Sequence, residues 1–81
     1  MEIKDIVLNI LVDVCEDEIV RERPDLNLFE AGLLDSVGFI QFLVELEERA
    51  NIRIAPTEVQ RSDFATPKMI VDYVLNIAGE I

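Results

Sequence analysis

The sequence predicts an all-α protein, a small antiparallel bundle of three main helices plus one short helix, in a single domain spanning residues 1–81. Three observations predict this class. Apolar residues recur at spacings of three and four in three segments, which is the period of a helix with one buried face. The one alternating stretch, "IRIAP", stops at Pro56 and has no partner strand. Hydrophobic residues make up 51% of the chain, which is enough for one core.

The first helix is expected over roughly residues 2–15, where the apolar stripe runs from Ile3 to Val14. The acidic run "EDE" at residues 16–18 is interpreted as its solvated end. Cys15 is interpreted as a small buried hydrophobe rather than a reactive thiol, because it continues the apolar face. With one cysteine and no histidine, no disulfide within the chain and no zinc site is expected, and a reducing compartment fits.

The segment "RERPDLNLFEAGLLD" is predicted to be a long loop, since Pro24 hinders a helix and Gly32 favours a turn. Its many leucines indicate that the loop packs on the core. The second main helix is predicted to begin at "DS" and to reach about Ala50. Asp35 is expected to be its N-cap, which leaves Ser36 in the first helical turn.

The rest of the chain contains two further helix starts. "TEVQ" at residues 57–60 matches a capping box and predicts the short helix. In "ATPKMIVDYVLNIAGEI", Thr66 is the expected N-cap and Pro67 the first helical residue of a helix that ends near Gly79. The side of that helix expected to face the core comprises Met69, Ile70, Tyr73, Val74 and Ile77.

The composition argues against an enzyme. The chain has no histidine, so a serine–histidine relay is absent, and an N-capping Asp35 would be a poor base for Ser36. A serine in the first turn of a helix is instead well placed to carry a phosphate, because the free amides and the helix dipole favour negative charge there. Gly38 either clears space for such a group or accommodates packing.

The stretch "GLLDSVGFIQFLVELEE" resembles the phosphopantetheine attachment motif of acyl and peptidyl carrier proteins, in which an Asp-Ser pair opens the second helix. The likeness extends over nearly the whole chain, because the helices and the long loop occur in the same order. It implies an acyl-carrier-protein-like fold, covalent 4′-phosphopantetheine on Ser36, and Asp35 as the adjacent N-cap.

Within that family the chain most resembles the D-alanyl carrier proteins of Gram-positive bacteria, through "NLFEAGLLDS" and "TEVQRSDFATPKMI". Four residues match the second pattern of that subgroup: Glu58, Arg61, Thr66 and Pro67. Three others, Val59, Gln60 and Phe64, stand where phenylalanine, aspartate and tryptophan are usual.

The resemblance implies that the terminal thiol of the arm holds D-alanine as a thioester for the D-alanylation of teichoic acids in the cell wall. It implies three partners: a phosphopantetheinyl transferase, a D-alanine-carrier protein ligase and a membrane acyltransferase machinery. It also implies a monomer, since a small carrier presents its arm to several enzymes in turn.

The second main helix carries more apolar residues than one buried face can hold, which indicates a docking surface near Ser36. By spacing, Phe39, Leu43 and Leu46 are expected in the core and Ile40 at its boundary. The residues expected to contact partners are Val37, Gln41 and Val44, and the acids Glu45, Glu47 and Glu48 are candidates for attracting a basic partner.

A net charge of −10 disfavours nucleic acid as a partner. No secretion signal and no stretch long enough to span a bilayer is evident, so a cytoplasmic protein is expected. Two alternative functions stay open: a carrier of another acyl or aminoacyl group, of the fatty acid, polyketide or nonribosomal peptide type, and an unmodified acidic helical adaptor.

Overall fold

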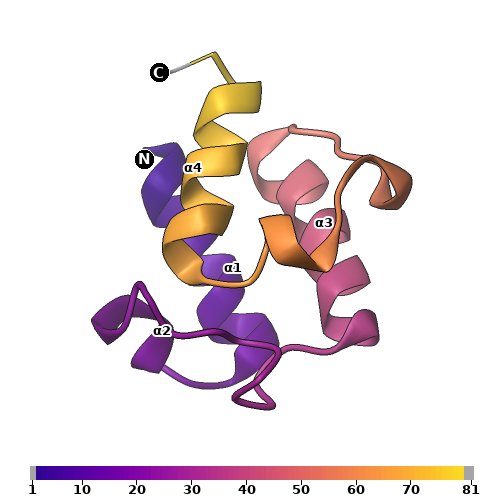
Figure 1. Cartoon of the computed structure of the whole chain (residues 1–81). Coiled ribbons are helices and arrows are strands. Elements are labelled where there is room, and N and C mark those ends of the chain that lie inside the picture. The colour runs from indigo at the N-terminus through magenta and orange to yellow at the C-terminus, as the bar shows by residue number, and fades with distance from the viewer. Residues whose placement is uncertain (1, 80–81) are drawn as a thin grey trace.

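A computed structural model describes residues 2–79, and all the regular structure in that range is helical. In Figure 1, α1 runs opposite to α3 and α4, and α1 contacts both of them. The described elements are α1 (Ile3–Cys15), α2 (Ile19–Glu22), α3 (Ser36–Ala50), the single 3₁₀ turns η1 (Pro56–Glu58) and η2 (Arg61–Asp63), and α4 (Pro67–Ile77). The all-α bundle predicted from the sequence is therefore confirmed.

The core lies where the three main helices meet, and an aromatic side chain from the segment before α4 fills its middle. Phe64 is fully buried, and its ring makes edge-to-face contacts with Phe39, Phe42 and Tyr73 at centroid separations of 5.4, 5.8 and 5.1 Å. Edge-to-face pairs of this kind are worth roughly 0.5–1.5 kcal/mol beyond the area they bury. Phe64 thus joins η2, α3 and α4 into one packed unit.

The loop between α2 and α3 is held by the core, as its leucines predicted. Leu28 is fully buried, and its backbone N–H donates to the carbonyl of Ala65 at 2.7 Å. The carbonyl of Leu28 accepts from the N–H groups of Leu33 and Leu34, at 3.0 and 3.1 Å, which closes a tight turn. Gly32 occupies this turn with φ +76°, a conformation that glycine adopts without strain. The loop therefore delivers the chain to α3 from a fixed position.

The start of α4 agrees with the sequence prediction. Thr66 has extended backbone angles, and its Oγ1 accepts from the N–H of Met69 at 3.1 Å, while Pro67 occupies the first helical position. The predicted buried side of this helix is wrong at two positions, because Met69 and Ile77 are exposed and Val71 is buried. The buried face of α4, which includes Ile70, Val71 and Val74, lies about one residue further round the helix than predicted, because tertiary packing decides which edge of an apolar stripe faces the core.

One further sequence expectation is wrong in detail. The "TEVQ" stretch does not form a capped helix, since η1 begins at Pro56 with Thr57 already inside it. The reciprocal capping box lies one turn later, between Gln60 and Asp63 at the start of η2. The acidic run after α1 is exposed, as expected of a solvated helix end, and Asp17 Oδ1 also accepts from the N–H of Ile19, the first residue of α2, at 3.0 Å.

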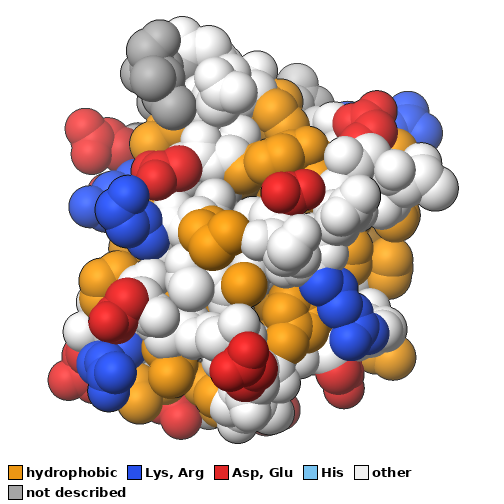
Figure 2. All heavy atoms as spheres, viewed as in Figure 1, with side chains coloured by type: hydrophobic (Ala, Val, Ile, Leu, Met, Phe, Trp, Pro, Cys, Tyr) orange, Lys and Arg blue, Asp and Glu red, His pale blue; other side chains and the backbone are white. Residues whose placement is uncertain are grey.

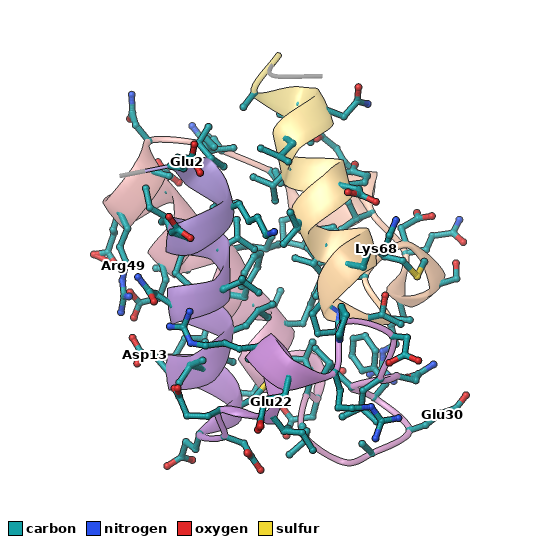
Figure 3. All side chains as sticks on the ribbon, turned by 90° about the vertical axis from the view of Figure 1, so that its left-hand side faces the viewer. Glu2, Asp13, Glu22, Glu30, Arg49 and Lys68 are labelled. Atoms are coloured by element: carbon teal, nitrogen blue, oxygen red, sulfur yellow. The ribbon has the colours of Figure 1, made fainter. Side chains whose placement is uncertain are left out.

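An ion pair fastens α3 to α1 on the side opposite the loop. Figure 3 shows Asp13 on α1 and Arg49 on α3 reaching toward one another, and Nη2 of Arg49 lies 2.7 Å from Oδ2 of Asp13. Arg49 also pairs with Glu45 at 2.9 Å, and these carboxylates raise the pKa of its guanidinium.

In residues 2–79, no helix has the length and apolar content needed to span a bilayer.

Candidate functional site

The N-terminus of α3 is built by Asp35. Its backbone is extended, its Oδ1 accepts from the N–H of Gly38 at 2.8 Å, and its carbonyl accepts from the N–H of Phe39 at 2.8 Å. The first bond satisfies one of the amides that a helix start leaves unpaired, and the second is the first regular bond of the helix. The predicted N-cap is confirmed, and Ser36 is the first residue of the helix.

Ser36 is exposed at this helix end, next to a cation from a distant part of the chain. Its Oγ accepts a hydrogen bond from Nη2 of Arg61, which lies 25 residues later in η2. Across the described part of the chain, no protein acceptor is bonded to the N–H groups of Ser36 and Val37. A hydroxyl, two backbone donors and a guanidinium therefore meet at one point, an arrangement suited to a phosphate group.

The guanidinium of Arg61 is itself held by an aromatic ring. Its Cζ lies 5.1 Å from the ring centroid of Phe29, a half-buried residue of the loop that packs against the core. A shallow hollow lies between the loop, the start of α3 and η2, and Ser36 opens onto it. The hollow is lined by Phe29, Gly32, Leu34, Asp35, Ser36, Val37 and Arg61.

Sequence reasoning matched Arg61 to a pattern but did not place it beside Ser36, and it gave Phe29 no role at the site. No periodicity connects residues 29, 36 and 61, since their meeting depends on how the loop and η2 pack on the bundle. A weak signal was present in the sequence. Arg61 is an arginine outside any predicted main helix, in a strongly acidic chain.

Gly38 allows close packing beneath the site. A Cβ atom built on it would lie 3.1 Å from Cδ1 of Leu34 and 3.2 Å from Cγ1 of Val14, both tighter than usual contacts. The missing side chain lets the first turn of α3 approach α1 and the end of the loop. Of the two interpretations that the sequence allowed, the structure therefore supports the packing role.

The outer face of α3 exposes an apolar strip that starts beside Ser36. The outer strip consists of Val37, Ile40 and Val44, whose exposed fractions are 75%, 43% and 52%. Together with Ser36, Gln41, Glu45 and Glu48, these residues line a shallow groove along the helix. The exposure predicted for Val37, Gln41 and Val44 is confirmed, whereas Ile40 is more exposed than the predicted core boundary.

Two acidic residues, Glu45 and Glu48, lie beside this strip in the groove along α3. Figure 2 shows acidic and basic side chains interspersed on one face of the molecule, with hydrophobic side chains visible between them and along the side where α3 lies. Glu47 and Glu48 are exposed, whereas Glu45 is half-buried and paired with Arg49. Of the three acids proposed to attract a basic partner, Glu45 is thus already neutralised within the chain.

The remaining reactive group is remote from solvent. Cys15 is 8% exposed, and desolvation, followed by the nearby charge of Asp17, raises its pKa to about 11. A thiol with that pKa is almost entirely protonated near neutral pH and is a weak nucleophile. The interpretation of Cys15 as a buried hydrophobe is confirmed.

Within residues 2–79, no cluster of three or more side chains suited to a metal is found.

The contacts of Ser36 limit the chemistry that the chain can perform. Arg61, which bonds its hydroxyl, has a guanidinium that offers N–H donors and no acceptor, so it does not serve as a base for Oγ. Among the described residues no carboxylate is bonded to that oxygen. Within residues 2–79, the hydrogen bond to Oγ therefore comes from a donor and not from a base.

Comparison with known families agrees with this geometry. The family described as "phosphopantetheine attachment site" matches residues 5–74, which is most of the chain. The matched range contains both serines of the sequence, Ser36 and Ser62.

Similar curated proteins share one description. A D-alanyl carrier protein of Abiotrophia defectiva is 48% identical over 68 residues, which cover 84% of this chain and 86% of the relative. D-alanyl carrier proteins of Bacillus velezensis and Bacillus cereus are each 44% identical, over 89% and 86% of this chain and over 92% and 89% of their own lengths.

Proposed function

The chain belongs to the family of proteins with a phosphopantetheine attachment site, and from that premise we propose that Ser36 bears the group. Proteins of this family carry 4′-phosphopantetheine covalently on a serine, so the chain is a carrier and not an enzyme. The observation that carries the choice of Ser36 is its place at the N-terminus of α3, exposed and in contact with the guanidinium of Arg61.

The second serine in the matched range lacks these features. Ser62 is exposed in the middle of η2, a single 3₁₀ turn of three residues, where few peptide dipoles add up. Ser36 begins a helix of 15 residues, which presents the full partial positive charge of a long helix. A phosphodiester is therefore better stabilised at Ser36, and Ser62 serves as its internal control.

The residues around Ser36 have separate tasks in this proposal. Oγ of Ser36 bonds to the phosphorus of coenzyme A that bears the pantetheine, the pyrophosphate bond breaks to release 3′,5′-ADP, and the hydroxyl proton passes to a base of the transferase. Asp35 fixes the first turn of α3 so that this oxygen stays at the surface. The attached group supplies a terminal thiol, which holds a carboxylic acid as a reactive thioester.

We further propose that the cargo is D-alanine and that it is destined for teichoic acids of the cell wall. The support is the shared description of the relatives, whose likeness covers most of the chain. The departures from the D-alanyl pattern do not change the exposed site. Val59 and Phe64 are buried in the core, and Gln60 caps η2.

The partners proposed on this basis are a phosphopantetheinyl transferase, a D-alanine-carrier protein ligase and a membrane acyltransferase machinery, and the proposed location is the cytoplasm. Val37, Gln41 and Val44 are proposed to contact these partners. All three are exposed on the face of α3 that begins at Ser36, so an enzyme that reaches the arm also meets this face.

The cargo is tested by loading the protein after attachment of the arm. The purified chain is incubated with coenzyme A and a phosphopantetheinyl transferase, then with ATP and a D-alanine-carrier protein ligase, and its intact mass is measured. We expect the added mass of one alanyl group, which hydroxylamine removes because it cleaves thioesters. The carrier of Bacillus velezensis is the positive control.

Parallel reactions with other activating enzymes separate the remaining functions. Loading of a fatty acyl, polyketide or other aminoacyl group, with D-alanine refused, would retain a carrier and reject D-alanine. Failure to acquire any arm, while the control carrier acquires one in the same tube, would contradict the carrier function. If Ser36→Ala then bound a partner of this chain's acidic surface as well as wild type does, the unmodified adaptor would be favoured.

A further inference from the structure

Arg61 differs from most basic residues of the chain in its partners. Arg49 pairs with Asp13 and Glu45, and three other basic residues lie within 4 Å of a carboxylate: Arg21, Arg23 and Lys68. Within residues 2–79, Arg61 has no carboxylate partner, although acidic residues outnumber basic ones by 17 to 7. Even the nearby Asp63 accepts from the backbone of Gln60.

Arg61 is nevertheless held both at its backbone and at its guanidinium. Its backbone carbonyl accepts from the N–H of Phe64 at 3.0 Å, which ties it to the centre of the core. Its guanidinium lies over Phe29 and donates to Ser36. A cation over an aromatic face is stabilised by roughly 0.5–1 kcal/mol at an exposed site, which restrains the guanidinium without using its N–H donors.

A guanidinium in this state has donors to spare. It carries five N–H groups in a planar fork, and one of them serves the hydroxyl of Ser36. The same fork matches two oxygens of a phosphate group and forms short, charge-assisted bonds with them. A phosphoester on Oγ would place its unesterified oxygens two bonds from the atom that Arg61 already contacts, within reach of the remaining N–H groups.

We propose that Arg61, held against Phe29, pairs with the phosphodiester attached at Ser36 and directs the root of the arm into the hollow between the loop and η2. The inference rests on the proposed function. It makes Arg61 and Phe29 positioning residues, because they orient the arm and take no part in the chemistry at its thiol. It also keeps the root of the arm away from Ile40 and Val44 of the outer strip, which stay free for partners, whereas Val37 borders both the hollow and the strip.

The test compares the phosphorus resonance of the arm in matched variants by ³¹P NMR. Wild type, Arg61→Gln, Arg61→Lys and Arg53→Gln are each converted to the arm-bearing form. Arg53 is exposed and its replacement removes the same charge, so Arg53→Gln controls for net charge. Far-ultraviolet circular dichroism verifies that each variant is folded.

We expect Arg53→Gln to keep the wild-type resonance and Arg61→Gln to move it most of the way to its position in urea-unfolded protein. Arg61→Lys should move it less, because lysine keeps the charge but loses the fork. Phe29→Leu, which keeps an apolar side chain, should shift the resonance in the same direction by a smaller amount. Nuclear Overhauser contacts between the side chain of residue 61 and the first methylene of the arm should be observed in wild type and absent from Arg61→Gln.

Two results would overturn the inference in distinguishable ways. An unchanged resonance in a folded Arg61→Gln that carries the arm would show that Arg61 does not hold the phosphodiester, while attachment itself stands. A wild-type sample with no phosphodiester at Ser36 would remove both the proposed function and the inference.

Discussion

The two faces of α3 have similar apolar side chains and opposite environments. The inner face buries Phe42, Leu43 and Leu46 at 5% exposure or less, whereas the outer strip leaves Val37, Ile40 and Val44 exposed. Burial contributes about 25 cal/mol for each Å² of apolar surface, so the inner face contributes to folding free energy. The outer strip contributes little until a partner covers it.

The difference shows that one helix can serve folding and association through two separate stripes. Positions 37, 40 and 44 recur at spacings of three and four, as the buried positions do. Hydropathy alone therefore does not distinguish the stripes, and their roles separate only when one face is mutated at a time.

The largest expected effect is on stability and comes from Phe64, whose ring packs against α3 from the core. Phe64→Ala removes the ring that contacts Phe39, Phe42 and Tyr73, and we expect a loss of about 3–5 kcal/mol in unfolding free energy. Urea denaturation followed by circular dichroism measures it. Val44→Ala is the matched outer-face change and should stay within about 0.5 kcal/mol. Equal losses in the two variants would contradict the division into faces.

The next largest effect is on partner binding, and it is expected from the outer strip rather than from the core. Val44→Asp should keep the stability of the wild type but raise the KM of the ligase for the arm-bearing protein about tenfold, equivalent to about 1.4 kcal/mol of binding. Met69→Asp is the control, since Met69 is also an exposed apolar residue but lies on α4. If both variants load as efficiently as wild type, the outer strip is not a docking surface for the ligase.

A smaller change in stability is expected at the N-cap of α3, where both faces of the helix begin. Asp35→Ala removes the acceptor for the N–H of Gly38 and should lower the unfolding free energy by about 1 kcal/mol. Asp35→Asn should restore most of that stability, because asparagine caps as well as aspartate. Thermal denaturation compares the three proteins. A fully stable alanine variant would mean that the cap is not needed to fix Ser36.

The effect that is smallest near neutral pH concerns the buried thiol of Cys15, because it develops only in alkaline solution. The folded pKa of Cys15, about 11, lies above its ordinary value of 9.0, so the unfolded chain loses this proton first as pH rises. The contribution of Cys15 is complete below pH 9 and is lost progressively as pH rises toward 11. Urea titrations at pH 8 and pH 10.5 should show a larger decline for wild type than for Cys15→Ala. Parallel declines would contradict a buried thiol.

Much of the candidate site could be predicted from the sequence because it is built by neighbours in the chain. Asp35 caps the helix that Ser36 begins, and this needs only the dihedral preferences and hydrogen bonds of adjacent residues. The outer position of Val37 likewise follows from the helical period. Local rules were therefore sufficient for the serine, its cap and the exposure of Val37 and Val44, but not for that of Ile40.

The rest depends on tertiary packing. The contact of Arg61 with Ser36 and Phe29 requires the loop and η2 to lie against the same end of α3, which no local pattern encodes. The misplaced capping box has a related cause. Several residues between 55 and 63 can start a turn, and the burial of Val59 and Phe64 decides which one does.

The central claim, that Ser36 bears phosphopantetheine, is tested most directly by intact mass after incubation with coenzyme A, magnesium and a phosphopantetheinyl transferase. Wild type, Ser36→Ala and Ser62→Ala are compared, so each serine of the chain is removed in turn. We predict one added group on wild type and Ser62→Ala and none on a folded Ser36→Ala. A group that persists on Ser36→Ala, or that is lost from Ser62→Ala, would contradict the assignment.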